Sequence, residues 1–134
     1  MKIYSIDNNN WLSVEPLESE GYTSFEVGVS VNIKHGVFEG KNIDINFLNY
    51  EEFLNDYDQF ISNRKIEPIL NGTYDSYFKF KAGKGNSIFL SFNISDSYAG
   101  YSATVDYSLI GEFEIDGEYL NEIHKNFKKL AKYA

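Results

Sequence analysis

Residues 73–115 constrain the fold most strongly, because this stretch predicts three consecutive antiparallel strands joined by short polar turns. In the last of them, apolar and polar residues alternate with a period of two, which is typical of a strand with one face on a core. The apolar positions are Ala103, Val105, Tyr107, Leu109, Phe113 and Ile115. At roughly 3.3 Å per residue such a strand would reach about 40 Å, so we expect a bend or bulge at Gly111.

The same alternation predicts strands earlier in the chain, at residues 2–6, 11–17, 25–33 and 42–48, and Pro16 indicates that the second of these lies at a sheet edge or ends there. The period then changes to 3.6 residues. Tyr50, Phe53, Leu54, Tyr57, Phe60 and Ile61 fall on one face of a predicted helix over residues 50–63. We expect Asn49 to cap this helix and Asp116 to cap a second helix near the C-terminus.

Strands in runs with only two helices predict an α+β fold, not alternating βαβ units. We expect a single domain over residues 1–134, in which a curved antiparallel sheet of about six strands carries the two helices. The chain has no cysteine, no apolar run long enough to cross a membrane and no signal-peptide pattern in its first ten residues. These features predict a soluble cytoplasmic protein.

The net charge of −8 is distributed unevenly along the chain. Residues 1–62 contain 11 acidic residues and three lysines, whereas the rest of the chain has nine acidic and nine basic residues. Nucleic acid is therefore not expected as a direct partner, since phosphate contacts require clustered basic residues. A negatively charged surface instead attracts a basic protein partner and speeds their association. The alternative interpretation is that the acidic excess serves only to keep the protein soluble.

The polar side of the predicted helix over residues 50–63 is the expected centre of such a partner surface. Because its apolar stripe must face the sheet, the acidic residues are turned outward or to the flanks. The candidate partner-binding residues are Asp44, Glu51, Glu52, Asp56 and Asp58.

Catalytic chemistry has little support in the sequence. The two histidines, His35 in a tight turn and His124 on the expected solvent side of the last helix, have no partners at metal-ligand spacing. Glu112 and Glu114 share a strand face, as two catalytic carboxylates can, but neighbouring acids on a strand are more typical of a solvent-exposed face. We therefore expect no enzymatic activity and no cofactor.

Tyrosines suggest an alternative function, because five of them lie within or beside the predicted meander: Tyr74, Tyr77, Tyr98, Tyr101 and Tyr107. Aromatic platforms of this kind stack on sugars or bases. The alternative hypothesis is a non-enzymatic module that holds a small molecule or carbohydrate on its curved sheet.

The order of elements resembles that of the WapI-like immunity proteins of bacterial polymorphic toxin systems. The resemblance rests on residues 25–33, on residues 42–61 with the Tyr-Glu-Glu-Phe-Leu segment at 50–54, and on residues 113–120. It implies a cytoplasmic, non-enzymatic protein that binds and neutralises a cognate secreted toxin domain, often a nuclease. It carries no functional residues over to this chain. Because such toxins are commonly basic, the resemblance and the charge distribution lead to the same hypothesis.

Overall fold

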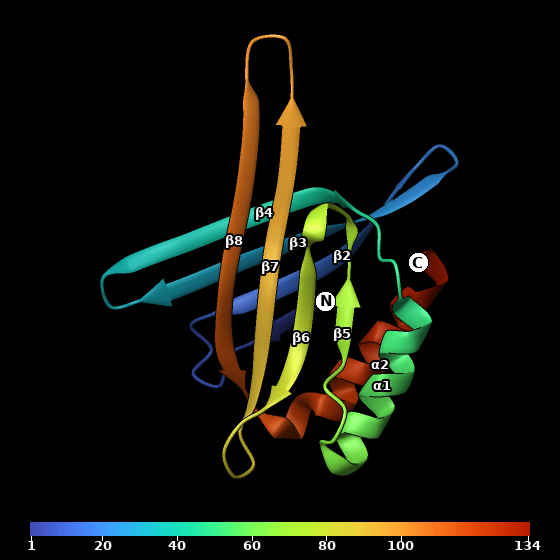
Figure 1. The fold of residues 1–134 in the computed structure, drawn as a ribbon. Helices are drawn as coiled ribbons and strands as arrows, with labels where there is room; N and C mark the ends of the chain where they lie inside the picture. Colours follow the sequence, from blue (N-terminus) through green and yellow to red (C-terminus); the bar gives the residue numbers. More distant parts are fainter.

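The computed structural model describes residues 1–134 as one α+β domain with two antiparallel sheets and two helices (Figure 1). The N-terminal sheet contains β1 (Lys2–Tyr4), β2 (Trp11–Ser19), β3 (Tyr22–Ile33) and β4 (Gly36–Ile45) in that order. After α1 (Tyr50–Asn63), the C-terminal sheet contains β5 (Ile69–Asn71), β6 (Tyr77–Ala82), β7 (Ile88–Ala99) and β8 (Thr104–Ile115). Helix α2 (Leu120–Leu130) ends the fold. Neither helix is long and apolar enough to span a membrane.

The prediction of one curved sheet with about six strands is wrong, since the chain forms eight strands in two separate sheets. Alternation shows that one face of a strand is buried, but not which strands pair. The three-residue strand β5 is also too short to show a period. Residues 73–75, predicted as the start of a strand, form a 3₁₀ turn in which Tyr74 and Asp75 have positive φ.

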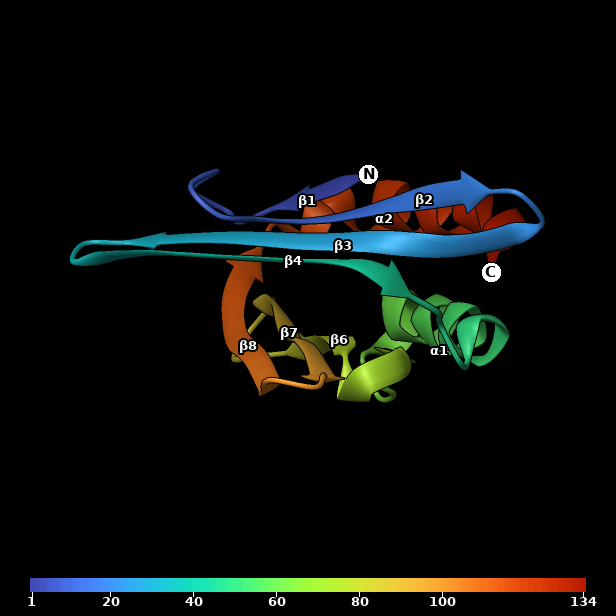
Figure 2. The same ribbon diagram turned by 90° about the horizontal axis from the view of Figure 1, so that it is seen from above.

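The two sheets pack face to face with their strands crossing steeply, and the core lies between them (Figures 1 and 2). Helix α1 lies in the layer of the C-terminal sheet, beside β5, and packs on α2, which lies in the layer of the N-terminal sheet (Figure 2). At the start of α1, the Tyr50 ring stacks 6.5 Å from the ring of Phe25 on β3. The predicted helix over residues 50–63 is confirmed, with Tyr50, Phe53, Tyr57 and Phe60 buried.

Helices α1 and α2 pack in antiparallel directions. The Tyr50 hydroxyl donates to the Phe127 carbonyl at 2.5 Å, and the Tyr57 hydroxyl donates to the Leu120 carbonyl at 2.9 Å. Burial raises the pKa of both phenols, because the interior disfavours their charged form. The two hydroxyls therefore remain donors that fix the register between the helices.

Asn49 does not cap α1, contrary to the expectation from sequence. Its side chain instead donates from Nδ2 to the Ile69 carbonyl at 2.9 Å and accepts from the Asn71 amide at 2.8 Å. It thus satisfies the backbone of the edge strand β5, where no neighbouring strand is available. Asp116 caps the 3₁₀ turn Gly117–Tyr119 that leads directly into α2, where its carboxylate accepts from the Glu118 amide at 3.0 Å. Pro16 lies, as expected, beyond the short pairing of β1 with β2.

Two hairpins extend beyond the body of the sandwich, one formed by β7 and β8 and the other by β3 and β4 (Figures 1 and 2). The register of β7 with β8 is continuous, so the expected bulge at Gly111 is absent; the Phe92 ring lies over this glycine. Val105 and Tyr107 share a face with buried Phe113, but Val105 is exposed because β8 continues past the other sheet, and Tyr107 lies at the rim of that sheet, against Gly40 of β4.

Candidate partner-binding surface

The five predicted acidic residues fall on two separate elements. Asp44 is exposed on β4, and its carboxylate accepts a hydrogen bond from the Tyr22 hydroxyl at 2.8 Å. Asn46 donates to the same hydroxyl at 2.9 Å, so Asp44 is held in a small polar cluster at the end of the N-terminal sheet. The other four residues lie on α1. None of the five forms an ion pair within the chain.

The four acidic residues on α1 lie on opposite flanks of the helix. At about 100° per residue, Glu52 and Asp56 share one flank of the buried stripe, whereas Glu51 and Asp58 share the other. Asp58 lies on the α2 side of the helix, because it follows by one turn Leu54, whose carbonyl oxygen lies 3.3 Å from Nε2 of His124 on α2. Glu52 and Asp56 are therefore the pair turned away from α2.

Helix α2 brings basic residues to the Glu51 side of α1. Since the helices are antiparallel, the C-terminal half of α2, which carries Lys125, Lys128 and Lys129, lies beside the first turns of α1. Lys128 and Asp58 both lie near enough to His124 to affect its charge. The surface where α1 and α2 meet therefore carries both positive and negative side chains. On α1, the flank with Glu52 and Asp56 is the one that lies away from these lysines.

His124 is not on the solvent side of α2, and this expectation is wrong. Its ring is buried and stacks on Tyr57, with centroids 4.8 Å apart and an interplanar angle of 8°. Nε2 lies 3.3 Å from the Leu54 carbonyl oxygen, which can only accept, so Nε2 carries the proton in this arrangement. The buried stripe of α2 is wider than its sequence suggests, because α1 packs on the side of α2 that carries His124.

The pKa of His124 lies below its ordinary value, mainly because of burial and also because of Lys128, while the Leu54 carbonyl and Asp58 act in the opposite direction. The folded state therefore favours neutral imidazole, and the unfolded chain binds the proton first on acidification. This contribution to stability is complete above the unfolded pKa of about 6.5 and is lost as the pH falls through the folded pKa.

We expect His124→Gln to reduce the loss of stability between about pH 7.5 and about pH 5.5, as measured by urea unfolding at each pH. His35→Gln is the matched control, since His35 is exposed in the turn between β3 and β4. Equal pH dependence in the two variants would show that His124 does not contribute to it.

The tyrosines of the meander do not form a shared platform. Tyr77 and Tyr107 point to opposite faces of the C-terminal sheet, because Phe78 is buried beside Tyr77 and Phe113 is on the face of Tyr107. Tyr98 and Tyr101 lie at the end of the β7–β8 hairpin, and Tyr74 is on the 3₁₀ turn before β6.

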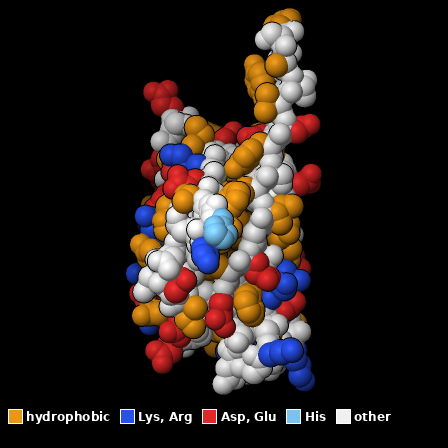
Figure 3. Space-filling view, turned by 90° about the vertical axis from the view of Figure 1, so that its left-hand side faces the viewer, with side chains coloured by type: hydrophobic (Ala, Val, Ile, Leu, Met, Phe, Trp, Pro, Cys, Tyr) orange, Lys and Arg blue, Asp and Glu red, His pale blue; other side chains and the backbone are white.

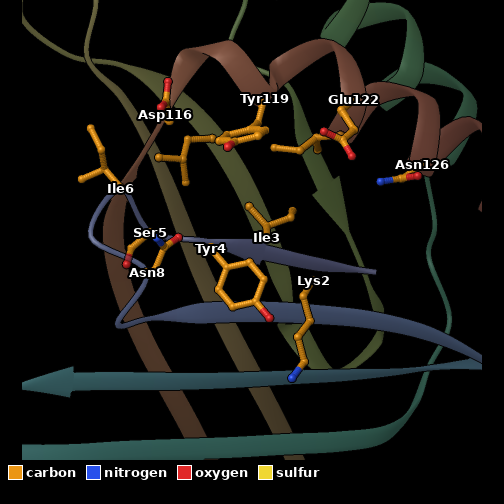
Figure 4. Close-up of a pocket in the computed structure, with 12 residues that line it drawn as sticks. Lys2, Ile3, Tyr4, Ser5, Ile6, Asn8, Asp116, Tyr119, Glu122 and Asn126 are labelled. Atoms are coloured by element: carbon orange, nitrogen blue, oxygen red, sulfur yellow. The ribbon is translucent and has the colours of Figure 1, made fainter.

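A groove of about 390 Å³ lies between β1 and α2 (Figure 4). Lys2 and Tyr4 line it from β1, and Tyr119, Glu122 and Asn126 from the side of α2. None of the five meander tyrosines reaches this groove. The structure brings together no group of three His, Asp or Glu side chains that could hold a metal ion.

A second acidic region lies in residues 63–134, although the acidic and basic residues of that half are equal in number. No lysine or arginine occurs between Lys84 and Lys125, so the whole β7–β8 hairpin is free of basic residues. It carries Asp96, Asp106, Glu112 and Glu114. Counting charges by structural element, and not by halves, would have found it, because the lysines of α2 cancel these acids in the sum.

Apolar side chains are exposed on both projecting hairpins, at Ile33, Phe38, Tyr98, Val105 and Ile110. The alternation of the sequence had predicted two of them, Ile33 and Val105, on buried strand faces. Contiguous exposed apolar patches with a polar rim mark interaction surfaces, whereas single exposed apolar residues are normal. Comparisons with protein-family profiles, characterised proteins and solved structures gave no match.

Proposed function

We propose that this chain is an immunity protein, which binds a basic, secreted toxin domain and neutralises it by occlusion at one-to-one stoichiometry. The observation that carries the proposal is the charge distribution: the entire net charge of −8 comes from residues 1–62. Glu52, which is exposed, and Asp56, which is half-buried, supply an unpaired part of it on one flank of α1. The sequence resemblance to WapI-like immunity proteins supports the same function, and the partner-binding role of Asp44, Glu51 and Asp58 belongs to this proposal.

Part of the acidic excess is already neutralised within the chain, which narrows the surface that a basic partner can use. The N-terminal ammonium pairs with Glu15, and Lys41 lies 3.5 Å from Glu26. Both acidic residues belong to the N-terminal sheet, where they face each other on β2 and β3. The unpaired acids of α1 therefore contribute more to the field that a partner meets at a distance.

The test begins with the neighbouring genes, since an immunity gene is expected directly after a large toxin gene with a variable C-terminal domain. Binding kinetics are then measured between this protein and that toxin domain at low and high ionic strength. Reversing the charges of Glu52 and Asp56 to lysine should slow association about tenfold at low salt and weaken its salt dependence. The rate of dissociation should change less, because the effect is one of steering.

Reversal of Lys128 and Lys129 to glutamate is the matched control, since these residues are exposed on α2. This control should leave association unchanged or faster. Unchanged association after the acidic reversal, together with loss of binding after the lysine reversal, would move the contact to α2. Absence of any binding to the toxin domain would contradict the proposed function itself.

A further inference from the structure

Strand β8 is the free edge of the C-terminal sheet, because it pairs only with β7. Its outward groups can be assigned from one contact: the Ile6 amide donates to the Glu114 carbonyl at 2.8 Å from outside the sheet. In an antiparallel strand, a residue directs its N–H and C=O to the same side, and alternate residues share that side. The backbone groups of Asp106, Ser108, Ile110 and Glu112 therefore point outward.

Other edges of the two sheets are protected, whereas this one is open. Strands β1 and β5 have three residues each, and β4 carries Lys41 and pairs with a register shift near Phe25. Proteins use short strands, lysines and irregular pairing of this kind to prevent association at sheet edges. Strand β8 has 12 residues, no lysine, no proline and a continuous register. Its edge is suited to pairing with another extended chain.

The β3–β4 hairpin lies beneath the place that a further strand would occupy. Along β4, Asn42 donates to the Ser95 carbonyl of β7 at 3.2 Å. Two residues before Asn42, Gly40 lies against β8, since a Cβ atom there would meet the side chains of Tyr107 and Leu109. Another two-residue step of about 7 Å reaches Phe38, and the next strand beyond β8 would lie about 5 Å away. Figure 1 shows the β3–β4 hairpin extending past β8 on this side.

The surface of the hairpin at this place is apolar and uncovered. Phe38 and Ile33 share the inward face of the N-terminal sheet with buried Val29, yet they are 50% and 59% exposed. Figure 3 views this side of the molecule, with the visible histidine marking the turn between β3 and β4 and hydrophobic side chains around it. A strand paired with β8 would bury its inward side chains on Phe38 and Ile33.

Charge determines which kind of strand fits the edge. The side chains of Asp106, Glu112 and Glu114 alternate with Tyr107 and Leu109 along β8, and only Glu112 has a basic partner, Lys81 at 2.8 Å. Cross-strand neighbours of opposite charge stabilise a pair, whereas like charges destabilise it. A second copy of this chain paired through β8 would oppose these acids with acids. A segment with alternating basic and apolar residues would match both faces.

We propose that the edge of β8 binds an extended segment of a basic protein partner as a fifth strand of the C-terminal sheet. The apolar side chains of that segment lie on Phe38 and Ile33, and its basic side chains lie beside Asp106, Glu112 and Glu114. The inference rests on the proposed function only in that the partner is a basic protein. It adds a docking surface on the opposite edge of the C-terminal sheet from α1.

The probe is a synthetic peptide of about ten alternating lysine and valine residues, added to the isotope-labelled full chain. Amide hydrogen exchange is followed by NMR. The amides of Asp106, Ser108, Ile110 and Glu112 should gain protection on peptide binding, whereas those of their odd-numbered neighbours are already paired with β7. A peptide in which glutamate replaces lysine should leave the exchange rates unchanged.

Two variants of β4 provide a matched pair. Phe38→Ser removes the apolar surface beneath the bound strand, and Val37→Ser makes a similar change at the next residue, whose side chain points to the other face and is 63% exposed. Peptide affinity should fall about tenfold in Phe38→Ser and stay unchanged in Val37→Ser. Neither variant alters β8.

Protection at β4 in place of β8, equal binding of the acidic peptide, or equal affinity of the two variants would each overturn the inference. So would protection of β8 in the absence of peptide that grows with protein concentration, since this indicates a second copy at the edge. The outcome is separable from that of the proposed function. Toxin binding without protection of β8 removes only the strand site, and peptide binding at β8 without toxin binding removes only the immunity role.

Discussion

Phe127→Ala is expected to lower the free energy of unfolding by about 3–5 kcal/mol. Phe127 is fully buried, and its ring packs on those of Tyr50, Phe53, Tyr57, Phe78 and Phe80, at centroid distances of 5.0–6.4 Å. These rings come from α1 and β6, so Phe127 joins both to α2. Truncation removes this apolar contact and leaves a cavity that rigid neighbouring rings cannot fill.

Urea unfolding at neutral pH measures the effect, with Phe38→Ala as the matched control. The control removes the same atoms from a half-exposed ring on the β3–β4 hairpin, and it should cost under about 1 kcal/mol. If the two variants lost equal stability, the aromatic cluster between α1, α2 and β6 could not be the centre of the core.

Gly111→Ala is expected to cost about 1–3 kcal/mol, because a methyl group at this position has no room. A Cβ atom built there lies 2.6 Å from Cζ of Phe92 on the paired strand. Phe92 is itself fully buried and packs against Phe113, with ring centroids 6.1 Å apart, so its ring cannot move aside without disturbing the core.

A double-mutant cycle with Phe92→Leu distinguishes this collision from a general effect on the strand. Leucine leaves room over residue 111, so Gly111→Ala should cost much less in the Phe92→Leu background. Additive losses in the double variant would show that the alanine acts through the backbone of β8 and not through the Phe92 ring. Gly21→Ala is no substitute control, since Gly21 has positive φ and is strained by any side chain.

The elements of this fold, apart from the three-residue strand β5, could be predicted from periodicity because each of them has one buried face. Helix α1 begins and ends at the predicted residues, and the stripe from Tyr50 to Phe60 is buried as expected. Division into two sheets could not be predicted in this way, since alternation is the same whichever strand lies opposite. Val105 and Ile33 show the same limit: both lie on the face that alternation assigns to the core, yet the opposing sheet ends before it covers them.

Polar residues were harder to place than apolar ones. Asn49 looked like a helix cap because asparagine is favoured before a helix, but tertiary contact with β5 uses both polar atoms of its side chain. His124 looked exposed because histidine is polar, but it stacks on Tyr57 across the helix interface. The acids of α1 were correctly expected outside the apolar stripe. Their division between two flanks follows from the helical period, whereas the choice of the flank that faces α2 depends on the position of that helix, which no local pattern encodes.

Each sheet is formed by one continuous part of the chain, with β1 to β4 in the first sheet and β5 to β8 in the second. A cut in the loop between Asn63 and Pro68 would therefore divide the protein into two fragments, each keeping all the ladders of its own sheet. What the cut divides is the cluster of rings, with Phe53 on one fragment and Phe80 and Phe127 on the other. The two pieces are complementary halves of one core, and reassembly depends on aromatic docking instead of strand exchange.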